Sequence, residues 1–542
     1  MRILFVFYNI GSGISFHPGI QVLSALAKRE GHETKLLHFH DKLVPDDPKV
    51  YIPVAKEFGP DLVAFTSTDF EYKKVNAIAL ELKKELNVPF LLGGKSAIEI
   101  ATKDISRSIF DIFCVGEAEI PFIELLKKIE GKEDYTKIRS LWIRKDNAII
   151  RNPLGENIID LDSLPFPDYD LFETEKIIEG KGGWLSLQFS RGCTFNCTYC
   201  YVTADKYQMF DKTKGEGRYG MERYLRNNSV EYSMKLVESL AQKYPEIKVF
   251  NLDDELPQSI EMHKNRGFSW WLDFCRQYKG RIHAKYGIKF CCNGRINLMT
   301  GDVIKAMVDA GCRECRMGFE CGSYRIRKEI LDKPITDEKM REIYGLCHKY
   351  GLRTTSFTMI GIPTETEDEI WDTIRMTAEL KPYLIRLSFC YPFENTRLWF
   401  YAKEHNLIKE DRLYQQHGYF EESVFKLPIE GQKLMAYRHL FPWYVNTVLL
   451  KDPKLVDLYK SKIEFYKDAD FRDAEVKLQI MKVDSQLSGI CGHASHFCYF
   501  GNGYFHYKNE YGKDLQKGQQ TQPASEEKVT PREVSATYAL EN

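Results

Sequence analysis

The sequence contains no run of about 18 apolar residues, the length that a membrane-spanning helix requires. We also expect no secretory leader, because the strand-like stretch 3–7 leaves no room before it for a charged segment and a cleavage site. We therefore expect no transmembrane segment and no export. The 14 cysteines are then expected to be thiols in a reducing compartment rather than disulfides. Together these absences predict a cytoplasmic protein.

A surplus of charge of one sign is also missing. The chain has 76 lysines and arginines against 77 aspartates and glutamates, so its formal net charge is -1. Nucleic-acid-binding proteins need basic side chains to neutralise phosphates, so we expect no nucleic-acid partner. A hydrophobic fraction of 43% and a charged fraction of 28% are typical of an ordered, soluble protein. At 542 residues the chain is too long for one core, which predicts about two or three domains.

The first part of the chain alternates short apolar stretches with amphipathic ones. Five stretches are predicted as strands: 2–8, 34–39, 62–66, 88–92 and 112–115. Continuous apolar strands separated by helices predict a doubly wound, Rossmann-like parallel sheet. Ligands of such sheets bind at the carboxyl ends of the strands. Hydroxyl groups and glycines follow three of these strands, and they either admit a large flat ligand or simply form turns.

The alternation resumes after a connector rich in proline and aspartate at residues 159–169. Six further strands are predicted at 184–189, 248–252, 288–292, 315–320, 354–360 and 384–390. Six strands with intervening helices predict a partial, open (β/α)6 barrel. The predicted domains are 1–150 (cofactor-binding), 151–182 (linker), 183–400 (barrel), 401–512 (mostly helical, shaping the substrate site) and 513–542 (a disordered tail).

Three cysteines follow the first strand of the predicted barrel. Cys193, Cys197 and Cys200 have the spacing C-x3-C-x2-C, which provides three thiolates for one compact 4Fe–4S cluster. With no fourth cysteine in the motif, one iron would be open to a ligand that is not protein. A zinc site, a redox disulfide and plain buried cysteines are the alternatives.

Two other groups of cysteines also have the composition of a metal site. Cys491, His493, His496 and Cys498 could reach one zinc ion. An auxiliary cluster could use Cys312, Cys315 and Cys321, although buried cysteines often serve only in packing.

The cysteine loop resembles the signature of the radical S-adenosylmethionine (SAM) enzymes, and Tyr199 before the last cysteine fits that signature. The resemblance implies that the amino and carboxylate groups of SAM chelate the open iron. It places Asp253 and Asp254 at the SAM amino group. It also places Glu320 and Ser323, in a segment similar to G-x-E-S-G-S, near the ribose and carboxylate, and Gly361 against the adenine.

The first domain resembles the cobalamin-binding domain that precedes one class of radical SAM enzymes. The residues that carry this resemblance are Asn9, Thr66, Ser67, Thr68, Gly93, Gly94, Gly116 and Glu117. The D-x-H-x-x-G loop that supplies a histidine to cobalt is absent, and His17 is predicted to be an ordinary loop residue. The resemblance therefore implies methylcobalamin without a histidine axial ligand.

Together the resemblances imply a cobalamin-dependent radical SAM enzyme. A 5′-deoxyadenosyl radical would remove hydrogen from an unactivated carbon, and methylcobalamin would supply a methyl group. The alternatives are a non-methylating reaction, such as the oxidative cyclisation of anaerobic magnesium-protoporphyrin ester cyclases, and a cobalamin- or redox-sensing protein without turnover. The expected partners are a small-molecule, lipid or peptide substrate and an electron donor such as flavodoxin or ferredoxin. We expect a monomer.

Overall fold

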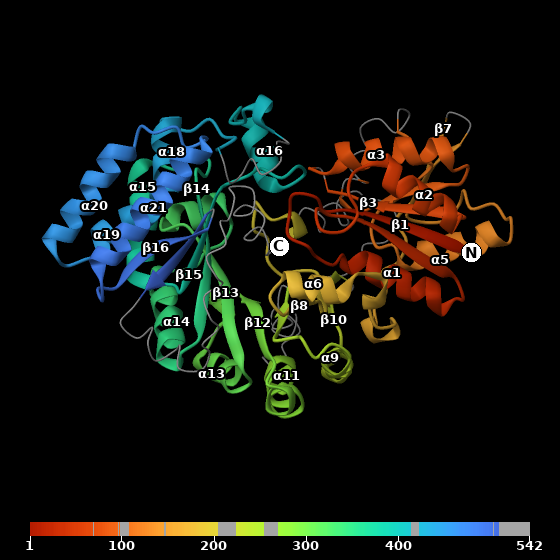
Figure 1. The fold of residues 1–542 in the computed structure, drawn as a ribbon, viewed down its shortest axis with the longest axis horizontal. Helices are drawn as coiled ribbons and strands as arrows, with labels where there is room; N and C mark the ends of the chain where they lie inside the picture. Colours follow the sequence, from red (N-terminus) through yellow and green to blue (C-terminus); the bar gives the residue numbers. More distant parts are fainter. Residues whose placement is uncertain are drawn as a thin grey trace. The chain divides into compact units, whose positions relative to one another are not determined.

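The computed structural model describes residues 1–68, 70–95, 97, 108–145, 148–203, 224–253, 269–413, 422–501 and 503–508 (Figure 1). Contacts divide this part of the chain into two compact units. The first contains residues 1–192 and 224–250, and the second contains the described residues of 193–203 and 251–508.

The first unit is built on a seven-stranded sheet with the order β2-β1-β3-β4-β5-β6-β7. Its strands are β1 (Arg2–Tyr8), β2 (Glu33–Phe39), β3 (Leu62–Thr66), β4 (Phe90–Gly93), β5 (Ile112–Cys114), β6 (Leu141–Lys145) and β7 (Ala148–Arg151). The five predicted strands are present and pair in parallel, whereas β6 and β7 add an antiparallel edge. This edge was not predicted.

Helices cover both faces of this sheet: α1 (Pro18–Arg29), α2 (Pro48–Phe58), α3 (Tyr72–Glu85) and α5 (Glu119–Glu130). Side chains of α2 and α3 share one core with β1 to β4. On the other face, Phe5 of β1 contacts Phe122 of α5. Buried strands between two helical layers confirm the doubly wound fold.

A second large sheet has the order β16-β17-β15-β14-β13-β12-β11-β8. Its strands are β8 (Trp184–Leu187), β11 (Val249–Leu252), β12 (Lys289–Gly294), β13 (Cys312–Glu320), β14 (Arg353–Ile360), β15 (Leu384–Phe389), β16 (His496–Gly501) and β17 (Tyr504–Lys508). The helices between the barrel strands are α9 (Val230–Lys243), α11 (Ser269–Tyr278), α12 (Ala284–Tyr286), α13 (Gly301–Asp309), α14 (Asp337–Tyr350) and α15 (Glu367–Leu380). Strands β12 to β15 run parallel, as predicted for a partial barrel.

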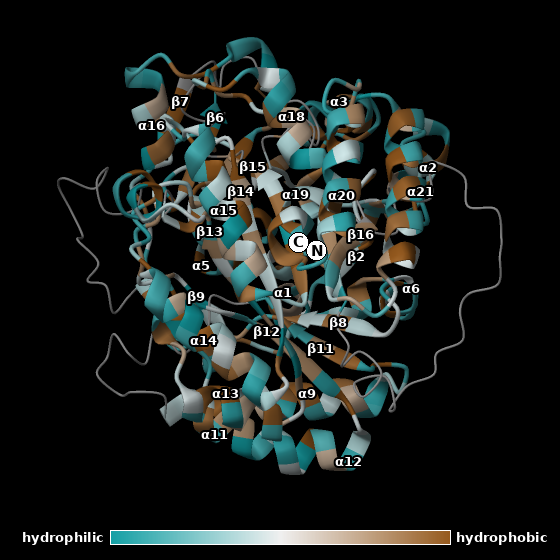
Figure 2. Cartoon of the chain, turned by 90° about the vertical axis from the view of Figure 1, so that its left-hand side faces the viewer, coloured by the Kyte–Doolittle hydropathy of each residue, from teal (hydrophilic) through white to brown (hydrophobic). Residues whose placement is uncertain are grey.

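Amphipathic sequence explains these helices. Thr366 begins α15 with a capping box, in which its hydroxyl and the carboxylate of Glu369 satisfy each other's backbone N–H groups. Helix α14 begins at Thr336, whose hydroxyl accepts the backbone N–H of Lys339, and it ends at Gly351 in the left-handed region. Figure 2 shows brown and teal residues alternating on the helices, as expected where one face of each helix is buried.

After the barrel the chain is mainly helical, as predicted, with α16 (Arg397–Glu404), α18 (Gly431–His439), α19 (Phe441–Leu449), α20 (Pro453–Tyr466) and α21 (Ala474–Cys491). The hairpin β16–β17 was not predicted. It extends the barrel sheet through an antiparallel pairing with β15, and Asn446 of α19 exchanges two hydrogen bonds with the backbone of Phe497 in β16. Within the described part of the chain, none of the helices has both the length and the apolar character that crossing a bilayer requires.

Three short elements lie on either side of the cysteine loop in the sequence. Helix α6 (Thr174–Gly180) precedes strand β8, and the two-residue strands β9 (Ser190–Arg191) and β10 (Arg226–Asn227) form a small antiparallel ladder. The cysteine loop begins directly after β9.

Candidate functional site

The cysteine loop is held at its root and at its centre. Gly192 has a φ of 85°, and a Cβ atom on it would lie 2.5 Å from the carbonyl oxygen of Tyr224, so only glycine fits. Further along, the backbone N–H of Thr198 donates to Leu331 and its hydroxyl donates to Ile330, at 3.0 and 2.5 Å. Cys193 and Cys197 are buried, and Cys200 is partly exposed.

An arginine from the barrel contacts this loop. Arg295 lies just after β12, and its Nη1 donates to Sγ of Cys197 at 3.3 Å. The guanidinium also stacks on the ring of Phe195, 3.3 Å from the ring centroid. A neighbouring cation favours the thiolate form of cysteine, which is the form that binds iron. The sequence analysis missed Arg295, although its place after a predicted barrel strand could have pointed to it.

The loop fits a cluster better than a single metal ion. Among the described residues, no three His, Cys, Asp or Glu side chains converge closely enough to hold one ion, and the loop cysteines are no exception. A cluster binds each thiolate to a different iron, so its cysteines can be more widely spaced. Three thiols on one loop beside a cationic side chain suit an anionic cluster of this kind.

Tyr199 and Glu320 lie together next to the cysteines. Tyr199 is hydrogen-bonded to Glu320, and burial together with the charge of Glu320 raises the pKa of the phenol well above its usual value. Glu320 is the last residue of β13, has a φ of 66° and accepts a hydrogen bond from Nζ of Lys333 at 2.5 Å. Lys333, which the sequence analysis also missed, neutralises this buried carboxylate.

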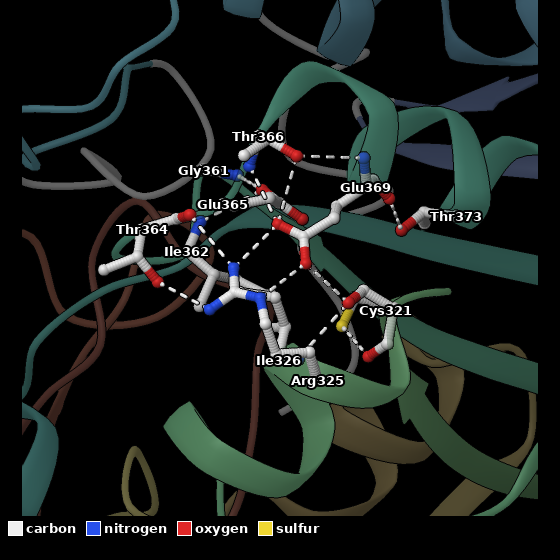
Figure 3. A network of polar contacts seen from close by, with 11 residues as sticks. Cys321, Arg325, Ile326, Gly361, Ile362, Thr364, Glu365, Thr366, Glu369 and Thr373 are labelled. Carbon is white, nitrogen blue, oxygen red and sulfur yellow. Dashed lines mark hydrogen bonds and ion pairs between the residues drawn. The ribbon is translucent and has the colours of Figure 1, made fainter.

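A second polar network joins Ser323 to the segment that follows β14 (Figure 3). The hydroxyl of Ser323 donates to Oε1 of Glu369 at 2.7 Å, and Arg325 donates to both oxygens of the same carboxylate at 2.9 and 2.8 Å. Because Glu369 also caps α15, the strand end that carries Ser323 is fixed to the start of that helix.

Gly361 adopts the left-handed region with a φ of 71° in the turn between β14 and α15. The turn is closed by Glu365, whose Oε2 accepts the backbone N–H groups of Gly361 and Ile362 at 2.6 and 3.2 Å. Burial raises the pKa of Glu365 to about 8. The two hydrogen bonds act in the opposite direction, but their effect is smaller than that of burial. The structure therefore brings the predicted SAM residues Glu320, Ser323 and Gly361 onto neighbouring strand ends.

A cavity of about 240 Å³ adjoins this turn. Ser423, Leu427 and Leu434 line it, and the same three side chains are the nearest neighbours of a Cβ atom built on Gly361. Phe389, at the end of β15, and Lys409 also line it. Most of the lining is apolar, charged side chains of both signs (Lys409, Lys426 and Glu422) also line the cavity, and the cavity borders the expected adenine position.

The two aspartates predicted to contact the SAM amino group have different outcomes. Asp253 accepts a hydrogen bond from Asn251 at 2.6 Å and lies 3.7 Å from Nη1 of Arg316. Its carboxylate therefore already has a cationic neighbour. Asp254 lies outside the described residues.

In the first unit the ends of β3 and β4 meet closely. Gly94 has a φ of 81°, and a Cβ atom on it would lie 2.6 Å from Oγ1 of Thr66 and 2.9 Å from the carbonyl oxygen of Ser67. Gly93 is the last residue of β4. The hydroxyl of Thr68 donates a hydrogen bond to Oε2 of Glu71 at 2.7 Å. This cradle, which admits only glycine, fits the close approach of a flat ligand to the backbone.

The loop after β1 is ordered by its own residues. Asn9 donates to the carbonyl oxygen of Gly13 and to Ser15, at 2.9 and 3.1 Å. His17 caps helix α1 by accepting the N–H of Ile20 through Nδ1, and its Nε2 lies 3.2 Å from Oγ1 of Thr66. Burial lowers the pKa of His17 to about 4. Both ring nitrogens thus have protein partners, in agreement with a structural role for His17.

The remaining predicted cobalamin residues, Gly116 and Glu117, follow β5. Gly116 has a φ of 92°. Glu117 forms ion pairs with Arg191 and Arg226, and these arginines hold the pKa of its carboxyl below the usual value although burial opposes ionisation.

The other cysteine groups are not arranged as metal sites among the described residues. The ring of His496 bonds Ser488 and the carbonyl oxygen of Ala494, both at 2.7 Å, and Cys491 lies 3.5 Å from the hydroxyl of Tyr459. Cys312 and Cys321 donate to the backbone carbonyls of Glu314 and Ser323. These thiols and this imidazole belong to the packed interior.

The sequence model of the radical SAM superfamily matches residues 187–377, a range that contains the three loop cysteines and the strand ends around Glu320 and Gly361. These residues form a radical SAM domain. Its relatives include an uncharacterized methyltransferase of Pyrococcus horikoshii, 26% identical over 72% of this chain and 79% of the relative. An anaerobic magnesium-protoporphyrin IX monomethyl ester cyclase of Cereibacter sphaeroides is 23% identical over 74% of this chain and 63% of the relative.

Solved structures share the fold of the radical SAM domain and of the sheet that precedes it. The methyltransferase TsrM from Kitasatospora setae, solved with cobalamin and a [4Fe–4S] cluster, has a TM-score of 0.57 and 16% identity, over 74% of this chain and 75% of TsrM. The cobalamin-dependent enzyme OxsB, solved with aqua-cobalamin and SAM, has a TM-score of 0.62 and 14% identity, over 90% of this chain and 75% of OxsB. The predicted fold is therefore confirmed.

Proposed function

We propose that this enzyme is cobalamin-dependent and transfers a methyl group from SAM, through cobalamin, to an unactivated carbon. The observation that carries the proposal is the pairing of a three-cysteine radical SAM domain with a doubly wound sheet whose strand ends form a glycine cradle. The fold shared with TsrM and OxsB supports cobalamin as the ligand of that sheet.

Each group of residues has a distinct role in this proposal. Cys193, Cys197 and Cys200 hold the cluster, and Arg295 balances part of its negative charge. Glu320, Ser323 and Gly361 bind SAM, with Tyr199 beside them, and Asp253 and Asp254 receive its amino group. When bound, the cluster would supply an electron for the cleavage of SAM, and cobalamin would supply the methyl group.

The first domain holds cobalamin in this proposal. Its ligands are the strand-end residues Asn9, Thr66, Ser67, Thr68, Gly93 and Gly94, together with Gly116. His17 remains bonded to its own helix, so cobalt takes no histidine from this loop. Residues 1–150 would form the cobalamin domain and 183–400 the SAM barrel, with 401–512 shaping the substrate site.

The protein's own contribution is to exclude water and to hold charges in place. Lys333 forms an ion pair with Glu320 in a buried position, and the carboxylate can also accept hydrogen bonds from a ribose. Glu365 fixes the turn at Gly361 without requiring a counter-cation, because its raised pKa leaves it protonated near neutral pH. The substrate, whether a small molecule, lipid or peptide, would enter beside the cavity at Ser423 and Leu434, and flavodoxin or ferredoxin would reduce the cluster.

The proposal is tested without a known substrate. The chain is reconstituted anaerobically with iron, sulfide and hydroxocobalamin, reduced, and supplied with SAM carrying a deuterated methyl group. We expect a cluster spectrum, bound cobalamin, 5′-deoxyadenosine and deuterated methylcobalamin. Cys197→Ala should abolish the cluster and 5′-deoxyadenosine. A chain that binds neither cluster nor cobalamin would contradict the proposal.

A non-methylating radical reaction is a second candidate, favoured by the likeness to the cyclase. It predicts 5′-deoxyadenosine with no transfer of label to cobalamin. A sensing protein without turnover predicts bound cofactors and no 5′-deoxyadenosine. The same experiment thus separates the three functions.

A further inference from the structure

We propose that Glu117 and Glu119, the two glutamates that follow β5, position the root of the cysteine loop through Arg191 and Arg226 and do not bind cobalamin. The inference rests on the proposed function, because it assigns a role within the same enzyme. It changes the expected role of Glu117, which the resemblance to cobalamin-binding domains had implied to be a cofactor ligand.

The four side chains form one ionic cluster. Arg191 donates to Oε1 of Glu119 at 2.6 Å and lies 3.2 Å from Oε2 of Glu117. Arg226 meets Glu117 with both terminal nitrogens, one of them at 2.9 Å from Oε2. Arg226 also donates to the carbonyl oxygen of Ile158 at 2.7 Å.

These groups are largely removed from water. The exposed fraction of the side chain is 4% for Arg226, 8% for Glu119 and 17% for Glu117. Ion pairs in such surroundings are screened little, so each partner strongly fixes the position of the others.

The ionic cluster of Glu117, Glu119, Arg191 and Arg226 acts on the cysteine loop through strands β9 and β10. Arg191 and Arg226 are directly opposite each other in this two-stranded ladder. Arg191 is two residues before Cys193, and Gly192 between them is pressed against the carbonyl of Tyr224. The ion pairs of Arg191 therefore act two residues before Cys193, where the cysteine loop begins.

Glu117 has little capacity left for a cofactor. Both of its oxygens accept hydrogen bonds from Arg226, and Arg191 adds a second positive charge beside Oε2. Glu117 and Glu119 thus bind the two arginines at the root of the cysteine loop, and they do not bind a cofactor at the sheet that they follow.

The test separates the two cofactors. The full chain and the variants Glu117→Gln and Glu119→Gln are reconstituted with both cofactors. Glu124→Gln, an exposed position on the same helix α5, is the matched control. Three quantities are measured: the dissociation constant for hydroxocobalamin, the rate of cluster loss to an iron chelator, and the thermal unfolding temperature.

We expect the Glu117 and Glu119 variants to bind hydroxocobalamin within about threefold of the wild type and to lose the cluster about 10–100-fold faster, as outer-shell changes do at other metal sites. Glu124→Gln should match the wild type in both. A larger loss of cobalamin affinity in Glu117→Gln overturns the inference, and so does cluster loss less than about tenfold faster. If Glu117→Gln does not fold, Arg226→Lys, which keeps the charge but loses the paired contact, carries the same test.

The failure of this inference differs from the failure of the proposed function. A wild-type chain that binds no cluster contradicts both. A wild-type chain that binds both cofactors, combined with variants that lose cobalamin or retain the cluster, contradicts the inference alone.

Discussion

Three ionisable side chains of the second unit are held by specific partners. Arg295 is bonded to Cys197, Lys333 to Glu320, and Glu365 to two backbone N–H groups. The first two keep charges paired in a buried region, whereas Glu365 has a carboxyl oxygen buried with no hydrogen-bond partner. Such a carboxyl is more stable when protonated. The cysteine loop thus lies among cations, and the adenine turn is held by a neutral acid.

Replacement of Arg295 by glutamine should lower the reduction potential of the bound cluster. A cation hydrogen-bonded to a cluster thiolate stabilises the reduced, more negative state, and hydrogen bonds to sulfur tune cluster potentials. The measurement is a redox titration of the reconstituted chain followed by electron paramagnetic resonance. Arg341→Gln, which removes an exposed ion pair with Glu379, is the control and should leave the potential unchanged. An unchanged potential in Arg295→Gln would show that this contact does not tune the cluster.

Glu365 should make the fold less stable as pH rises from about 4.5 to 8. The folded state keeps this carboxyl protonated up to its pKa of about 8, whereas the unfolded chain ionises it near 4.5. The unfolded state therefore binds fewer protons in this window, and stability falls by up to about 1.4 kcal/mol per pH unit. Glu365→Gln cannot ionise and should remove this slope.

The measurement is the thermal unfolding temperature of both proteins at pH 5.5 to 8. Glu379→Gln, at an exposed position on helix α15, which follows the turn of Glu365, is the control and should keep the wild-type slope. If Glu365→Gln and the wild type depend equally on pH, Glu365 is ionised in the folded state.

At the scale of elements, the site depends on close contact between strand ends and the helices that follow. The end of β13 lies against α15 at Gly322, whose N–H donates to Oγ1 of Thr373 at 2.8 Å. A Cβ atom on Gly322 would lie 2.1 Å from the backbone carbonyl carbon of Asp372. Helix α15 therefore sets the position of the segment that carries Glu320 and Ser323.

Gly322→Ala should destabilise the fold by about 1–3 kcal/mol, because the added methyl group must push α15 away from β13. It should also weaken SAM binding, measured by isothermal titration with the reconstituted chain. Gly345→Ala is the matched control, since Gly345 is exposed inside helix α14 and its Cβ would meet nothing within 4 Å. That change should stabilise the protein by about 0.5–1 kcal/mol. Equal effects of the two substitutions would mean that β13 and α15 can separate at little cost.

At the scale of the whole molecule, the cysteines are distributed through the interior. All 14 lie in the described residues and none forms a disulfide, and only Cys200 is partly exposed. Burial raises the pKa of several of them, including Cys114 to about 12. Buried neutral thiols are inert, so chemical reactivity is concentrated at the cysteine loop.

Alkylation of the cluster-free chain under anaerobic conditions should modify Cys200 first. Peptide mass spectrometry after brief exposure to iodoacetamide measures the order, and the chain unfolded in urea, where all 14 thiols should react, is the control. Reconstitution of the cluster should protect Cys200. Reaction of a barrel cysteine as fast as Cys200 in the folded chain would contradict the buried arrangement.

The pattern of residues along the chain determined the parallel sheets and the cysteine loop. Both are local: a buried strand needs only a short apolar stretch, and three cluster ligands within eight residues are brought together by one loop. The hairpins β6–β7 and β16–β17 escaped prediction because each joins its sheet by antiparallel pairing with a strand that is more distant in sequence, β5 and β15 respectively.

Only the tertiary structure decided which charged side chains meet. Arg295 is 98 residues from Cys197, and Arg226 is 109 residues from Glu117, so no spacing in the sequence could pair them. The segment around Glu117 was correctly located at a strand end, but whether its carboxylates faced a cofactor or two arginines depended on the fold. Sequence alone identified the cysteines that would start the chemistry, whereas the packing of distant strands supplied the charges around them, because electrostatic partners are selected by distance in space.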